Sequence, residues 1–173
     1  AKSGFMVADP LTLYDCCPTS DGASAVILVA DHLAHKFTDT PIWVKGSGAG
    51  SDHLALHDRP SLTQLRVTQN AALKAYKTAG VTAGDVDLAE VHDCFTIAEV
   101  LATEDLGFAG RGLGGRFARE GQGRRNEGSV TINASGGLKS KGHPLGATGT
   151  GQAVEIFKQL RHQVEPERQV RDA

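Results

Sequence analysis

The sequence predicts an α/β protein in which a mostly parallel sheet is covered by helices. Short continuous apolar runs alternate with segments whose apolar residues recur at helical spacing, and turns rich in Gly, Pro and Asp separate them. This alternation is typical of parallel strands joined by helices. The 173 residues are enough for one domain with its own apolar core, so we treat residues 1–173 as a single domain.

Two strands are expected in the N-terminal third of the chain. Residues 1–20 contain proline breakers and are predicted to be extended and loop-like. Residues 24–30 form a continuous apolar run, which favours a strand buried on both faces of a sheet. A short helix is expected over 31–37, and a second strand over 42–48 ends in a glycine-rich loop.

Longer elements are predicted further along the chain. Apolar residues at helical spacing indicate a helix of about four turns that ends at Gly80, a residue suited to the backbone conformation that follows a helix. The remaining expected elements are a strand over 88–92, a helix over 96–106, a strand over 130–133 and a helix over 145–161.

Charge and hydropathy exclude several kinds of partner. The formal net charge is −2, so the composition gives no general attraction to nucleic acid or to a membrane surface. No apolar run is long enough to span a bilayer, and the first residues lack the apolar core of a signal peptide. We therefore expect a cytoplasmic protein that binds neither nucleic acid nor membrane.

The segment 108–128 is polar and rich in glycine and arginine. It is too long for a simple connection between two elements, which indicates a functional loop within the domain. Most of its arginines are expected to be solvated, and one or two of them could contact an anionic ligand.

A glycine-rich stretch over 134–151 carries His143 directly before the predicted helix over 145–161. Pro144 suits the first turn of that helix, because its missing N–H is not needed there. The positive end of the helix dipole disfavours imidazolium, and a neutral His143 ring could donate a hydrogen bond to a developing oxyanion. Glycines such as Gly137 and Gly142 would let a ligand approach the backbone. The alternative is a tight turn with a solvent-facing histidine.

His92 and Cys94 follow another predicted strand. Because ligands bind beyond the carboxyl ends of parallel strands, these residues and His143 are predicted to share one site. A thiol near imidazoles can act as a nucleophile or as an acid and base. A small buried apolar side chain is the alternative interpretation of Cys94.

The three cysteines do not indicate a disulfide framework, because their number is odd and Cys16 and Cys17 are adjacent. A metal site built from Cys16, Cys17, His92 and Cys94 has no supporting ligand spacing, so we expect no metal. The glycine patterns also fail as phosphate-binding motifs. His143 stands where a Walker motif requires lysine, and the glycines over 146–151 have the wrong order for a dinucleotide fold.

Three motifs together resemble the thiolase family over nearly the whole chain. Residues 133–137, Asn-Ala-Ser-Gly-Gly, followed by 142–149, Gly-His-Pro-Leu-Gly-Ala-Thr-Gly, resemble the GHP block of thiolases. Residues 92–95, His-Asp-Cys-Phe, resemble the HDCF motif of the sterol-carrier-protein-2 type and of archaeal thiolases. Residues 20–25 resemble the segment that opens the C-terminal thiolase half.

This resemblance implies the C-terminal half of a usually dimeric enzyme that makes or cleaves 3-oxoacyl-CoA through an acyl-cysteine. Coenzyme A or acyl-CoA is then a substrate, and no tightly bound cofactor is expected. By the same resemblance, His143 activates the nucleophile and lines an oxyanion hole, His92 serves the other oxyanion hole, and Cys94 is the acid/base cysteine. Cys17 matches a position near the pantetheine arm.

Two departures from the family pattern shape these expectations. The acyl-accepting cysteine belongs to the N-terminal thiolase half, which residues 1–173 lack, and the last two strands of the family fold lie beyond Ala173. We therefore expect a partial thiolase domain that is inactive alone and needs the missing half as its partner. Without those two strands, residues 24–30 are expected to form an open sheet edge.

Two functions other than acyl transfer are compatible with the same motifs. Some thiolase-like proteins with these motifs resemble retro-aldolases that act on steroid side-chain CoA esters together with an OB-fold partner protein. The third possibility is a non-catalytic subunit that binds acyl-CoA as part of a scaffold.

Overall fold

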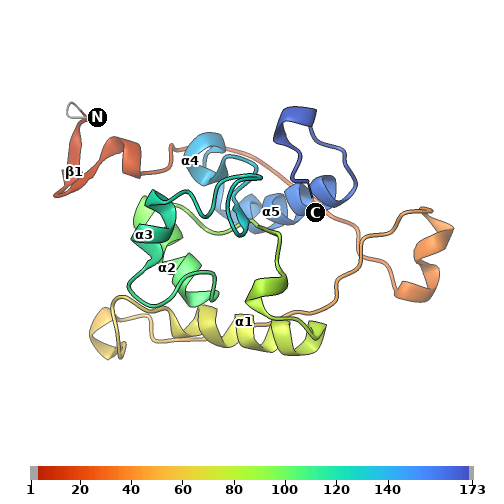
Figure 1. Cartoon of the computed structure of the whole chain (residues 1–173), viewed down its shortest axis with the longest axis horizontal. Coiled ribbons are helices and arrows are strands. Elements are labelled where there is room, and N and C mark those ends of the chain that lie inside the picture. Colours follow the sequence, from red (N-terminus) through yellow and green to blue (C-terminus); the bar gives the residue numbers. More distant parts are fainter. Residues whose placement is uncertain (1–3, 172–173) are drawn as a thin grey trace.

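A computed structural model describes residues 4–171 of the chain, and the outermost residues of the predicted domain, 1–3 and 172–173, lie outside this range. The hairpin of β1 (Met6–Ala8) and β2 (Leu11–Thr12) lies at one end of the long axis, and a loop with the 3-10 helix η2 (Asp31–Lys36) projects at the other (Figure 1). The strands are β1 (Met6–Ala8), β2 (Leu11–Thr12), β3 (Leu88–Ala89) and β4 (Thr131–Ile132). The helices are α1 (Arg66–Ala79), α2 (Thr96–Asp105), α3 (Gly114–Arg119), α4 (Gly137–Lys141) and α5 (Leu145–Leu160).

The parallel pair of β3 and β4 positions the rest of the fold. Leu88 pairs with Thr131 and Ala89 with Ile132, and the N–H of Asn133 donates to the carbonyl of Ala89 at 2.8 Å. Both strands are shorter than predicted, yet they run in the same direction. The loops that follow them therefore leave from the same edge. This mixed α/β arrangement confirms the predicted fold class.

The predicted helices are confirmed close to their expected bounds. Gly80 follows α1 with φ of +73°, the left-handed conformation that glycine adopts without strain. Pro144 directly precedes the first residue of α5, as its fixed φ favours. No helix among residues 4–171 is both long enough and apolar enough to cross a membrane.

The two strands predicted over 24–30 and 42–48 are wrong for this structure. Both segments are drawn out, but no strand pairing is recorded for either of them within residues 4–171. A strand needs a neighbour that completes its ladder of hydrogen bonds, and these segments have none. Their apolar side chains are consequently not buried on two faces: Ile27 is 91% exposed, Leu28 79% and Val44 75%.

Four smaller differences concern three segments that were predicted to be irregular and one predicted short helix. Residues 1–20 contain the antiparallel hairpin β1–β2 and the 3-10 helix η1 (Leu13–Asp15). The helix expected over 31–37 is the 3-10 helix η2 (Asp31–Lys36). The glycine-rich stretch holds α4, and the loop over 108–128 holds α3. Further 3-10 turns are η3 (Leu56–Asp58), η4 (Ala83–Asp85) and η5 (Pro166–Arg168).

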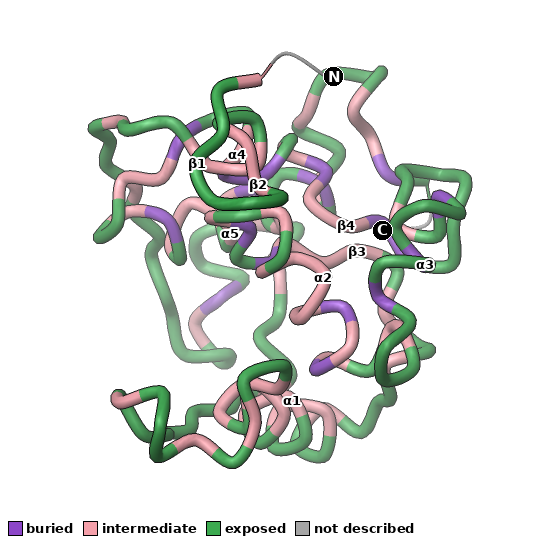
Figure 2. Tube along the Cα trace, turned by 90° about the vertical axis from the view of Figure 1, so that its left-hand side faces the viewer, coloured by how far each residue is buried: buried purple, intermediate pink, exposed green. Residues whose placement is uncertain are grey.

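The core is small and surrounds the parallel pair. Val91, Val130 and Ala134 flank the two strands and are buried, and Leu138 of α4 is fully buried. Much of the remaining chain is exposed, including most of the extended N-terminal part (Figure 2). The loops around β3, β4 and α4 are therefore the best-enclosed part of the described structure.

The C-terminal segment is attached to α5 by one buried amide. The side chain of Gln159 is fully buried, and its Nε2 donates to Glu155 Oε1 and to the carbonyl of Arg168, each at 3.0 Å. Its Oε1 accepts from the N–H of Val170 at 3.0 Å. Arg168 also forms an ion pair with Glu155. The C-terminal segment is thus held to α5 by satisfied buried polar groups.

Glycines let residues 46–50 lie close against α1. A Cβ at Gly48 would collide with the carbonyl of Ala71, and one at Gly46 would collide with the carbonyl of Ala75. Because alternate residues of an extended chain face the same side, Gly46 and Gly48 face the helix backbone together.

We expect Gly48→Ala to lower the free energy of unfolding of the intact protein by about 1–3 kcal/mol, because the added methyl group displaces this segment from α1. Gly115→Ala is the control, since nothing lies within 4 Å of a Cβ at that position. Urea unfolding of both variants measures the difference. A Gly48→Ala protein as stable as the unsubstituted one would contradict the close packing.

Candidate active site

The chain segments that follow β3 and β4 bring the candidate histidines into contact. His92 follows β3, and His143 lies between α4 and α5. The centroids of their rings are 4.7 Å apart, and the ring planes are inclined by 81°. The edge of one imidazole therefore meets the face of the other. Two residues that are far apart in the sequence form a single imidazole pair at the edge of the sheet.

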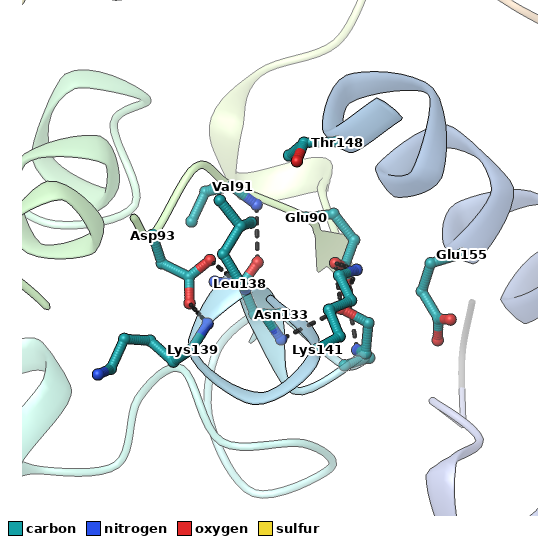
Figure 3. A network of polar contacts seen from close by, with 12 residues as sticks. Glu90, Val91, Asp93, Asn133, Leu138, Lys139, Lys141, Thr148 and Glu155 are labelled. Atoms are coloured by element: carbon teal, nitrogen blue, oxygen red, sulfur yellow. Dashed lines mark hydrogen bonds and ion pairs between the residues drawn. The ribbon is translucent and has the colours of Figure 1, made fainter. Parts of the chain in front are cut away.

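The carboxylate of Asp93 joins these two loops. Its Oδ1 accepts from the N–H of Leu138 at 2.8 Å, and its Oδ2 accepts from the N–H of Lys139 at 3.4 Å (Figure 3). Both donors belong to the first turn of α4, where backbone N–H groups lack partners within the helix. Asp93 is only 2% exposed, so its charge depends on these donors.

Gly137 leaves room for the carboxylate of Asp93 beside α4. It has φ of +66°, and a Cβ there would collide with the carboxylate of Asp93. Gly137 was a candidate for substrate binding on the sequence alone. The structure places it, buried, against Asp93.

Asn133 forms a second bridge between the strand ends. It adopts φ of +52°; its Oδ1 accepts from the N–H of Val91 at 2.8 Å, and its Nδ2 donates to Glu99 Oε2 at 2.9 Å. Burial raises the pKa of Glu99, and the hydrogen bond from Asn133 acts in the opposite direction.

Glu90 forms a third bridge. Its Oε1 accepts from the N–H of Ser135 at 2.9 Å, and its Oε2 accepts from the hydroxyl of Ser135 at 2.6 Å. Lys141 donates to the same hydroxyl at 2.7 Å and lies 3.5 Å from Glu90 Oε2 (Figure 3). All three bridges fix the segment before His143 to the segment that carries His92.

His143 is oriented by a hydroxyl of α5. Its Nδ1 lies 2.7 Å from Thr148 Oγ1, and that hydroxyl lies 3.1 Å from the carbonyl of Pro144. When the hydroxyl donates to the carbonyl, it accepts from Nδ1–H. A neutral ring in that tautomer carries its lone pair on Nε2. His143 is then held as a base whose reactive nitrogen is Nε2.

Cys94 lies opposite Cys17. The N–H of Cys17 donates to the carbonyl of Cys94 at 2.9 Å, and an antiparallel bridge joins Cys16 to Phe95. Burial raises the pKa of the Cys94 thiol, and the nearby thiol of Cys17 contributes in the same direction. Burial therefore favours the protonated thiol of Cys94.

The environment of His92 favours its neutral form. Burial is the main cause that lowers the pKa of His92; His143 lowers it further, and Asp93 opposes both. A neutral imidazole keeps one N–H donor at neutral pH.

A cavity of about 760 Å³ lies beside these residues. It is lined by residues 17–24 and by the turn from His143 to Ala147 at the start of α5. Gly142 packs so closely against Ser20 that a Cβ at position 142 would collide with the hydroxyl of Ser20. That hydroxyl is buried and has no hydrogen-bond partner among the described residues. The hydroxyl of Ser20 is thus enclosed by the chain, while His143 and Cys17 line the cavity.

The arginine-rich segment contributes nothing to this cavity. Arg111 forms ion pairs with Glu104 at 3.1 Å and with Asp105 at 2.7 Å. These ion pairs attach the segment over 108–128 to α2. Within the described range, no three His, Cys, Asp or Glu side chains are grouped as metal ligands.

Sequence reasoning missed Asp93 and Thr148 as positioning residues. The position of each residue in the sequence could have indicated this role. Asp93 stands directly between the two candidate residues His92 and Cys94, and Thr148 lies in the first turn of the helix that follows His143.

Comparisons with known proteins indicate what kind of domain carries this arrangement. A family model described as "Thiolase C-terminal domain-like" matches residues 48–173. The chain is 55% identical over 156 residues to an acetyl-CoA acetyltransferase of Methanothermobacter thermautotrophicus, covering 90% of this chain and 40% of that protein. It is 39% identical over 160 residues to the benzoylsuccinyl-CoA thiolase subunit BbsB of Thauera aromatica, covering 91% and 41%.

A third relative is sterol carrier protein 2 of Homo sapiens, which is 38% identical over 160 residues, covering 90% of this chain and 29% of that protein. The chain thus spans about two fifths or less of the length of these relatives. Among solved structures, an Ltp2-ChsH2(DUF35) aldolase superposes with a TM-score of 0.80 at 22% identity, covering 94% of this chain and 42% of that one. That likeness shows the shared fold.

We expect His143→Ala to raise the pKa of His92 in the intact protein, because it removes the nearby imidazole that opposes protonation. Burial should still hold this pKa below the usual value of about 6.5. An NMR titration of the imidazole resonances measures the shift. His57→Ala is the control, because the His57 side chain is 84% exposed and lines no part of the cavity. An unchanged pKa in His143→Ala would contradict the ring contact.

Proposed function

Because the chain belongs to the thiolase family, we propose that the protein is an acyltransferase that acts on coenzyme A thioesters. His92, Cys94 and His143 supply the acid–base and oxyanion-binding groups in this proposal. The contact between the His92 and His143 rings, beside a cavity of about 760 Å³, is the observation that carries it. A pair of imidazoles next to an open cavity suits chemistry in which negative charge develops on a carbonyl oxygen.

The reaction we propose is the cleavage of a 3-oxoacyl-CoA by coenzyme A or its reverse, the Claisen condensation of two acyl-CoA molecules. Support comes from relatives that are named acetyl-CoA acetyltransferase and benzoylsuccinyl-CoA thiolase subunit. Because the chain covers about two fifths of these relatives, we place the acyl-accepting cysteine in another part of the protein.

His143 is proposed to activate that cysteine. With Nδ1 held by Thr148, the Nε2 lone pair can take the proton of the attacking thiol. The ring is then a donor that can stabilise the oxyanion of the tetrahedral intermediate. The hydroxyl of Thr148 fixes the ring plane through both steps.

His92 and Cys94 are proposed to serve the enolate. A neutral His92 ring donates its N–H to the oxygen of the enolate, and its lowered pKa keeps it from capturing a proton itself. In the cleavage direction, the Cys94 thiol gives its proton to the α-carbon of the departing enolate. In the condensation direction, the Cys94 thiolate removes the same proton. The raised pKa of Cys94 supports its role as the acid.

Two variants of the intact protein test this assignment. We expect Cys94→Ala to lower Claisen turnover by about 10²–10⁴-fold, the usual contribution of a positioned acid or base. Acyl-enzyme should still form in this variant, because another residue accepts the acyl group. His143→Ala should slow the formation of acyl-enzyme itself. Turnover is followed by release of coenzyme A, and acyl-enzyme by intact-protein mass spectrometry.

Cys16→Ser is the matched control for Cys94→Ala, since Cys16 lies next to the cavity-lining Cys17 but is not among the lining residues. It should retain the activity of the unsubstituted protein. Unchanged turnover in Cys94→Ala would remove Cys94 from the mechanism, and normal acylation in His143→Ala would refute the role of His143. Binding of a CoA thioester with no covalent adduct in the unsubstituted protein would overturn the acyltransferase proposal.

A further inference from the structure

Cys17 and Cys94 occupy opposed positions on two neighbouring chain segments. The antiparallel bridge between Cys16 and Phe95 sets the register, and the N–H of Cys17 donates to the carbonyl of Cys94 at 2.9 Å. One step along each segment from the bridge, Cys17 therefore faces Cys94. Opposed residues of this kind have Cα atoms about 5.5 Å apart. Disulfides join Cα atoms about 4.4–6.8 Å apart.

We propose that Cys17 and Cys94 form a reversible disulfide when the protein meets a low-molecular-weight disulfide oxidant. Cys16, Cys17 and Cys94 are free thiols in this structure. The inference goes beyond the proposed function, because the cross-link requires only the placement of two thiols and an oxidant.

Cys16 is excluded as the partner of Cys94, although it is adjacent to Cys17. Successive side chains of an extended segment point to opposite faces, so Cys16 and Cys17 cannot both face Cys94. The Cys16 thiol instead donates to the carbonyl of Thr12 at 3.6 Å, within its own segment. The chain thus carries a built-in control one residue away from the reacting cysteine.

The oxidant can reach the pair from the cavity. Cys17 is among the lining residues, and both Cys17 and Cys94 are partly exposed. Burial raises the pKa of the Cys94 thiol, so its thiolate forms less readily at neutral pH. We therefore assign the first attack to Cys17 and the second to Cys94.

The exchange is balanced with oxidised glutathione as the oxidant. The Cys17 thiolate attacks one sulfur of the oxidant, a mixed disulfide forms, and one glutathione thiolate leaves. The Cys94 thiolate then attacks the Cys17 sulfur, the protein disulfide forms, and the second glutathione thiolate leaves. The two cysteine protons end on the two released thiols. The cysteines lose two electrons in total, and the oxidant gains them.

The cross-link would place a covalent bridge at the edge of the cavity and consume the thiol of Cys94. If the proposed acid–base role of Cys94 holds, turnover stops on oxidation and returns with a reductant. The disulfide itself is read by mass, without any assay of turnover. Failure of this inference is therefore distinguishable from failure of the proposed function.

The test uses the intact protein in a Cys16→Ser background, where each relevant tryptic peptide holds one cysteine. After treatment with oxidised glutathione and digestion without reductant, we expect peptides 3–36 and 78–111 to be linked. Dithiothreitol should release them. The yield per unit time should increase with pH, because the Cys94 thiolate becomes more abundant. Adding Cys17→Ser should abolish the link.

A measurement without substitution guards against misfolding of the variants. In the unsubstituted protein, oxidation should protect Cys17 and Cys94 from iodoacetamide and leave Cys16 open to it. Three results would overturn the inference: glutathione adducts that never resolve into a protein disulfide, a link between Cys16 and Cys94 in a Cys17→Ser protein that retains Cys16, or loss of Cys16 labelling together with the other two.

Discussion

The buried carboxylate of Asp93 holds the two halves of the candidate site together. It binds the first N–H groups of α4, at Leu138 and Lys139, while its neighbours in the chain are His92 and Cys94. A carboxylate that is 2% exposed is stable only with such donors, and the positive end of a helix favours its charge. Loss of this contact would leave both the carboxylate and the helix N–H groups unsatisfied. This contact therefore fixes the segment that carries His92 to the segment that precedes His143.

Other features of the site follow from this constraint. Gly137 has no Cβ because the carboxylate fills that space, and Asn133 and Glu90 tie the same two segments at either side. The site is thus fixed by satisfied polar groups more than by apolar packing, which suits a chain whose buried core is small. Thr148 completes the arrangement from α5 by setting the His143 ring. Acid–base chemistry at a carbonyl group requires such preorganised donors.

Helical periodicity and terminal residues were sufficient to place α1, α2 and α5, because these signals lie within each segment. The strands over 24–30 and 42–48 could not be placed in this way, because pairing depends on a neighbour that the segment itself does not encode. The sequence did not indicate α4, because the helix lies in a glycine-rich stretch. Its hydrogen bonds to Asp93 and the burial of Leu138 stabilise it. The meeting of His92 and His143 was predictable, since parallel strands end at one edge of a sheet. The structural role of Asp93 was not predictable, because the hydrogen-bond partners of a buried carboxylate are known only from the folded structure.

A crystal structure of the intact protein with a non-hydrolysable CoA thioester would show whether substrate binds at the imidazole pair. We predict that the thioester lies in the cavity between residues 17–24 and the start of α5. Its carbonyl oxygen should face the imidazoles of His92 and His143, with Asp93 bound to α4 as described here. A ligand bound at another face of the domain, or a His143 ring turned away from His92 in the complex, would contradict it.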